Sequence, residues 1–87
     1  MEDIILANQQ LNEWCSTESI NYYEGDTALG FLFKYAVPDD CTIQFQQHGD
    51  ELDCVVFSSN EWYWGKAGKK EYAPALFWAL WKVKEME

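Results

Sequence analysis

The sequence predicts a small α+β domain with the element order ααβββα. Three observations carry this prediction. Apolar residues recur at helical spacing in the first third of the chain, alternate with polar residues between positions 41 and 67, and crowd together in "ALFWALWKV" at 75–83. The 87 residues contain no repeat or linker, so residues 1–87 are expected to form one domain. Five Trp, five Tyr and five Phe supply the bulk that so small a core needs.

Two helices are expected before the strands. Residues 3–14 predict the first, because Asp3 can cap its N-terminus and the apolar residues that follow repeat at helical spacing. A second helix, capped by Asp26 or Thr27, is expected to continue to about Ala36.

Three antiparallel strands are expected next, at "CTIQFQQ", "LDCVVF" and "WYWGKA". A turn centred on Gly49-Asp50 joins the first two. Alternation places Val55 and Phe57 on the face opposite the core side of the second strand, yet both are apolar. The second strand is therefore expected to be covered on both sides, as in a small α-β-α sandwich with a three-stranded meander.

The register of the third strand stays open at this stage. A two-residue turn in "SSNE" places Tyr63 beside Val56, whereas a three-residue turn places Trp62 and Trp64 there. One residue of register exchanges all side chains between the two faces. The last helix follows "EYAP", with Pro74 in its first turn.

The last helix is apolar over more than one face. Leu76, Leu80 and Val83 mark one stripe, while further aromatic residues lie outside it. Because so short a chain does not easily enclose five Trp, we expect Trp78 or Trp81 to be partly exposed. Exposed aromatic residues anchor interaction sites, so this helix is expected to contact a partner or, most simply, a second copy in a homodimer.

The net charge is −9, from fifteen acidic residues against six lysines and no arginine. Nucleic-acid binding needs cations, so the composition argues against direct contact with nucleic acid. The acids cluster in predicted turns, and we expect them near one end of the sheet. They can be a solvated loop surface, or they can dock a basic protein, for example one that itself binds nucleic acid. The clustered acids are Asp39, Asp40, Asp50, Glu51 and Asp53.

No catalytic motif or cofactor motif is present, so we expect a protein without enzymatic activity and without a cofactor. His48, the one histidine, falls in a predicted turn and is expected to be solvated. A zinc site of His48 with Cys15, Cys41 and Cys54 lacks the close cysteine pair typical of such sites, so free thiols are favoured. "MEDIILANQQ" does not resemble a signal peptide, and no apolar run reaches the ~18 residues of a membrane span, which predicts a cytoplasmic protein.

The pattern resembles the phage ABA-sandwich domain, a family of small phage and prophage proteins. The stretches that carry the resemblance are "DIILANQQLNEW", "DTALGFLFKYAVP", "CTIQFQQHG", "DCVVFSSNEWYWGKAG" and "EYAPALFWALWKVKE". The chain departs from the pattern in its short link between the first two helices and in Phe77-Trp78 of the last helix. The resemblance implies an α-β-α sandwich and a phage origin, and it transfers no catalytic residue.

Two functional hypotheses follow. The first is a non-enzymatic phage or prophage protein that binds a host or phage protein, for instance to inhibit a defence nuclease. The alternative is a protein that binds or sequesters a nucleotide, with an aromatic side chain stacked on the base and lysines on the phosphate. The residues of this alternative site are Trp62, Trp64, Lys66, Lys69 and Lys70.

Overall fold

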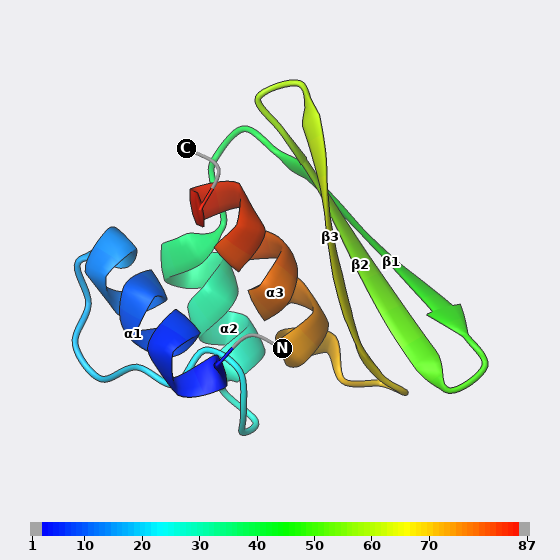
Figure 1. The fold of residues 1–87 in the computed structure, drawn as a ribbon, viewed down its shortest axis with the longest axis horizontal. Coiled ribbons are helices and arrows are strands. Elements are labelled where there is room, and N and C mark those ends of the chain that lie inside the picture. Colours follow the sequence, from blue (N-terminus) through cyan, green and yellow to red (C-terminus); the bar gives the residue numbers. More distant parts are fainter. Residues whose placement is uncertain (1–2, 86–87) are drawn as a thin grey trace.

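The computed structural model describes residues 3–85. These residues form helix α1, helix α2 with a π-helical turn η1, a sheet of order β1-β2-β3, and helix α3 (Figure 1). Both strand pairs are antiparallel. The elements are α1 (Ile4–Cys15), α2 (Ala28–Phe31), η1 (Leu32–Ala36), β1 (Thr42–His48), β2 (Glu51–Ser58), β3 (Glu61–Gly68) and α3 (Tyr72–Glu85). The predicted α+β class, the antiparallel three-stranded meander and the element order are confirmed.

The layers are stacked differently from a sandwich with the sheet in the middle. Helix α3 lies between the sheet and the layer that contains α1 and α2 (Figure 1). Within residues 3–85, all helices therefore lie on one side of the sheet, and its other face, called here the outer face, has no helix against it. Val55 is nevertheless only 4% exposed, because side chains of its own sheet surround it.

The inner face of the sheet packs closely on α3. Leu52, Cys54 and Val56 of β2 are buried there together with Leu76, Phe77 and Leu80 of α3. Gly65 of β3 sets the approach, since a Cβ atom at this position would lie 2.6 Å from the Ala79 amide nitrogen and against the Ala75 carbonyl. A backbone-to-backbone approach of this kind requires glycine.

The register left open by the sequence is settled by a two-residue turn. Val56 pairs with Tyr63, and Ser58 pairs with Glu61. The two turn residues, Ser59 and Asn60, both have positive φ, of 53° and 66°. Such a turn matches the right-handed twist of a hairpin. As a result Tyr63 faces α3, and Trp62 and Trp64 point to the outer face.

The helix ends agree with the sequence in part. The Asp3 carboxylate accepts hydrogen bonds from the Ile5 and Leu6 amides at 2.9 and 3.4 Å, so the predicted cap is confirmed. Thr27 precedes α2 without a side-chain cap. The second helix widens into the π-helical turn at Leu32–Ala36, where the Val37 amide donates to the Leu32 carbonyl at 2.9 Å.

Two asparagines of α1 hold the link to α2. The side chain of Asn12 donates to the Ile20 carbonyl and accepts from the Ile20 amide, at 2.9 and 3.0 Å. Asn8 accepts from the Tyr22 amide at 2.9 Å. The side-chain amides of the two asparagines thus supply hydrogen-bond partners to the backbone of the link, which is not helical. The sequence pattern gives no sign of this role, because asparagine in a helix is usually a solvated residue.

Replacing Asn12 with alanine is expected to destabilise the chain by about 2–3 kcal/mol, since Ile20 and Thr17 lose buried hydrogen-bond partners. Urea unfolding measures the change. The matched control is Asn21→Ala, because Asn21 bonds the exposed Tyr23 and Glu24 amides and its loss is expected to cost under about 1 kcal/mol. Equal losses in the two variants would show that the Asn12 contacts do not stabilise the link.

Candidate protein-interaction site

The outer face carries a compact aromatic patch, defined here as Val55, Phe57, Trp62 and Trp64. Trp62 and Trp64 are 57% and 46% exposed, and the Phe57 ring lies 4.7 Å from the Trp62 ring. Val55 forms the floor of a shallow hollow of about 400 Å³, whose walls are Trp62 and Trp64 on one side and two glutamines of β1 on the other. Large aromatic groups are therefore presented to solvent at fixed positions on a sheet.

The register explains why these side chains gather. Phe57 pairs with Trp62 and Val55 with Trp64, so the four residues occupy two adjacent rows of the same face. Thr42 and Gln44 continue these rows on β1. Within residues 3–85, no other Phe, Trp or Tyr lies on the outer face, so the patch occupies one end of the face.

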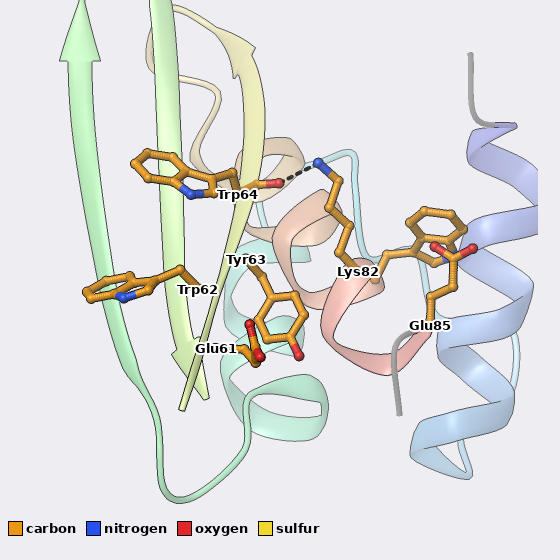
Figure 2. Close-up of a pocket in the computed structure, with 7 residues that line it drawn as sticks. Glu61, Trp62, Tyr63, Trp64, Lys82 and Glu85 are labelled. Atoms are coloured by element: carbon orange, nitrogen blue, oxygen red, sulfur yellow. Dashed lines mark hydrogen bonds between the residues drawn. The ribbon is translucent and has the colours of Figure 1, made fainter. Parts of the chain in front are cut away.

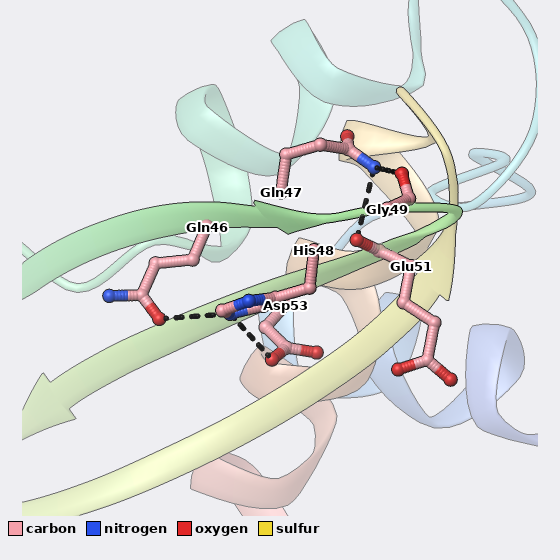
Figure 3. A network of polar contacts seen from close by, with 6 residues as sticks. All are labelled: Gln46, Gln47, His48, Gly49, Glu51 and Asp53. Atoms are coloured by element: carbon pink, nitrogen blue, oxygen red, sulfur yellow. Dashed lines mark hydrogen bonds and ion pairs between the residues drawn. The ribbon is translucent and has the colours of Figure 1, made fainter.

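The other end of the outer face is polar. The His48 Nε2 lies 3.6 Å from the Asp53 carboxylate and 3.4 Å from the Gln46 side-chain oxygen (Figure 3). On the other side of β1, the Gln47 amide bridges the turn by donating to the Gly49 and Glu51 carbonyls at 2.8 and 3.0 Å. The side chain of His48 is 59% exposed. It therefore ends a strand in contact with solvent, as a surface residue does.

The acidic residues do not form one cluster, which corrects the sequence-based expectation. Asp39 and Asp40 precede β1, whose first residue pairs with Phe57 beside the β2–β3 turn. Asp50, Glu51 and Asp53 belong to the β1–β2 hairpin at the opposite end. The length of β1 separates Asp39 and Asp40 from Asp50 and Glu51 by roughly 20 Å, whereas Asp53 lies in the row next to Val55 and Trp64. Only the first group, joined by Glu61, lies at the aromatic end.

The C-terminal helix offers less apolar surface than the sequence predicted. Trp81 is 7% exposed, and its indole N–H donates to the Gln10 side-chain oxygen at 2.8 Å. The expectation that Trp78 or Trp81 would be partly exposed is confirmed for Trp78 and not for Trp81, whose indole lies against α1. Trp78 is half-buried and contacts the Phe77 and Trp81 rings. Helix α3 therefore exposes less apolar surface than expected, and a homodimer through this helix stays a prediction.

The alternative nucleotide site is only partly assembled. Trp62, Trp64 and Lys66 share the outer face of β3. Lys69 and Lys70 lie in the turn before α3, beyond the polar end of the face. Lys66 pairs across the sheet with Asp53, a residue of opposite charge that competes with a phosphate for the lysine.

The three cysteines are free thiols, and Cys54 lies in the core. Burial raises the pKa of the Cys54 thiol from its ordinary value of 9.0 to about 12. Burial likewise raises the pKa of Tyr22, which is fully enclosed, from 10.0 to about 12. Burial also raises the pKa values of Cys15 and Cys41. A thiol with a raised pKa is a weak nucleophile, so Cys54 is suited to packing rather than chemistry.

The free energy of unfolding is expected to fall as the pH rises from about 9 to about 12. The folded chain keeps Cys54 and Tyr22 protonated at a pH where the unfolded chain ionises them, so their contribution is complete below pH 9. Urea midpoints measured across this range test the prediction. A Cys54→Ala, Tyr22→Phe variant should lose less stability over the same range, and an equally steep loss in that variant would contradict the assignment.

Comparison of the chain with protein-family models, with curated proteins and with solved structures finds no match. The resemblance to the phage ABA-sandwich domain stays a prediction. Within residues 3–85, no helix is both long enough and apolar enough to cross a membrane.

Proposed function

We propose that the protein is a non-enzymatic interaction module that binds a basic host or phage protein through the aromatic patch. The observation that carries this proposal is the pair Trp62 and Trp64, adjacent on one face and 57% and 46% exposed. Apolar patches on a soluble chain mark interaction sites, and tryptophan is enriched among the residues that dominate binding energy. A rigid sheet also holds the two rings in place, which lowers the entropy lost on binding.

The charge of the chain supports a basic partner. The net charge is −9, and Asp39, Asp40 and Glu61 lie at the aromatic end of the sheet. The face of an indole ring attracts the cationic groups of lysine and arginine. A protein that binds nucleic acid, such as a defence nuclease, presents cations that these carboxylates can contact in place of phosphates. A phage or prophage origin is part of this proposal.

A tagged pull-down from bacterial lysate, with and without nuclease treatment, tests the proposal. The native chain and a Trp14→Gln control, in which an exposed tryptophan of α1 is replaced, should capture the same basic protein. A Trp62→Gln, Trp64→Gln variant should not. If the double variant still captured the protein, the binding surface would lie elsewhere on the chain. If nuclease treatment abolished capture, the contact would depend on nucleic acid and not on a direct protein partner.

Neutralising the acids next to the patch is expected to weaken binding more than neutralising those at the far end. The Asp39→Asn, Asp40→Asn variant should slow association with the captured partner by about tenfold at low salt, while Asp50→Asn, Glu51→Gln changes it less. Stopped-flow or surface-based kinetics at two salt concentrations measure the difference. Indistinguishable association rates for both variants would contradict an acidic contribution from the aromatic end.

Nucleotide binding is the second candidate, favoured by the common face of Trp62, Trp64 and Lys66. An indole can stack on a base, and the lysine can contact phosphate. A thermal-shift screen with mononucleotides and cyclic nucleotides at millimolar concentration decides it. The absence of any shift would remove this candidate.

A further inference from the structure

A second hollow, of about 610 Å³, lies beside the aromatic patch, between the free edge of β3 and the end of α3 (Figure 2). Residues 61–64 of β3 line one side. Trp81, Lys82 and Glu85 of α3 line the other side. Trp62 and Trp64 border both this hollow and the one on the outer face. The edge of β3 is therefore accessible along the same segment that carries the exposed tryptophans.

The backbone of this edge is not paired with another strand. The Trp64 carbonyl points away from β2 and toward α3 (Figure 2). In an antiparallel strand the N–H and C=O of one residue point to the same side, and alternate residues share that side. The polar groups of Trp62 and Lys66 therefore also face the edge. Within residues 3–85, no other backbone segment bonds to them.

One side chain occupies the edge. The Lys82 ammonium donates to the Trp64 carbonyl at 2.7 Å. Lysine is a common protector of sheet edges, because its charge opposes pairing with another chain. Lys82 is exposed and its stem is flexible, so this contact can be exchanged for another donor at little cost.

We propose that the β3 edge takes an extended segment of the partner as a fourth strand, which displaces Lys82 from the Trp64 carbonyl. The proposal rests on the proposed function and names how the partner engages the same site. Strand addition supplies backbone hydrogen bonds for affinity, and pockets for alternate side chains give specificity. Alternate side chains of the segment contact the exposed Trp62 and Trp64 rings on one face and the hollow above Trp81 on the other.

The charged residues that line the hollow indicate which charge the bound segment carries. Glu61 of β3 and Glu85 of α3 are both exposed and line opposite sides of the hollow, and Lys82 is the single cation among the residues that line it. Once Lys82 is displaced, an arginine or lysine of the segment is needed to face these carboxylates. The occupant is therefore a basic extended peptide. A second copy of this chain is disfavoured, since each copy has a net charge of −9.

A displayed library of random linear peptides, selected on the full chain, supplies the probe. The selected peptides should carry a basic residue and alternate in polarity. On binding such a peptide, the hydrogen-exchange rates of the Trp62 and Trp64 backbone amides should fall by about tenfold or more. Lys82→Ala should raise the affinity about fivefold, because a competing hydrogen bond is gone. Lys69→Ala, which removes the same charge away from the edge, should not raise it.

The peptide itself gives a matched control. Methylating the amides on one edge of the extended peptide should abolish binding, and methylating the alternate series should not. One result would overturn the strand-addition inference and leave the proposed function intact. In it, peptide affinity depends on Trp62 and Trp64, but the edge amides exchange as fast as in the free chain and Lys82→Ala does not change the affinity. A library that enriches no extended basic peptide would also overturn it.

Discussion

Replacing Gly65 with alanine is expected to destabilise the fold by about 3 kcal/mol or more, the largest effect of a single methyl group in this chain. The added Cβ would lie 2.6 Å from the Ala79 amide nitrogen and against the Ala75 carbonyl, and both are backbone atoms of α3. Backbone atoms of a helix cannot relieve a clash by a change of rotamer, as a side chain can, so α3 has to move away from β3. That movement opens the contact at the centre of the core.

The matched control is Gly30→Ala. Gly30 lies in α2, and a Cβ there would meet no atom within 4 Å. This variant is expected to be more stable by up to about 1 kcal/mol, since alanine favours the helix and restricts the unfolded chain. Thermal or urea unfolding of both variants measures the contrast. A Gly65→Ala chain as stable as the native one would show that α3 does not approach β3 as closely as described.

Replacing Trp62 and Trp64 with glutamine is expected to weaken partner binding by about 100-fold or more, because each exposed aromatic anchor of an interface contributes on the order of 2 kcal/mol. The same replacements are expected to cost the fold only about 1 kcal/mol each, since both rings are largely solvent-exposed. Calorimetric titration with the captured partner and urea unfolding of the free chain separate the two effects.

Trp14→Gln serves as the control for the loss of an exposed indole, since Trp14 is 37% exposed on α1 and lies outside the sheet. Its affinity for the partner should equal that of the native chain. If the double variant lost binding only because it unfolded, its urea midpoint would fall with its affinity. Binding by the double variant at native strength would contradict the role of the aromatic patch.

The element order could be predicted because each element has a local signature. Asp3 at the first helix, the alternation of β1 and Pro74 in α3 each identify one element without its neighbours. The β3 register could not be predicted, because "SSNE" has no glycine to mark the turn. Ser59 and Asn60 adopt the left-handed conformation that glycine usually takes.

The layer order and the site required contacts that are distant in sequence. An apolar Val55 can be covered by a helix or by its neighbours on the sheet, and alternation does not distinguish the two. Composition indicated that some tryptophan would be exposed. The identity of the exposed tryptophan depends on how α3 crosses β3 at Gly65. In this arrangement Trp81 is buried, and Trp62 and Trp64 are exposed. All of these residues were identified from the sequence, but the most exposed tryptophans lie on β3 and not on α3, where exposure was expected.

The outer face of the sheet is the proposed binding surface for the partner. Backbone and indole NMR signals of the chain, followed during titration with the captured partner, test it most directly. We expect the perturbed signals to come from Val55, Phe57, Trp62 and Trp64, with Trp14 unchanged. Perturbations confined to α1 and α2, for example at Ile5 and Phe33, which are also exposed, would contradict it.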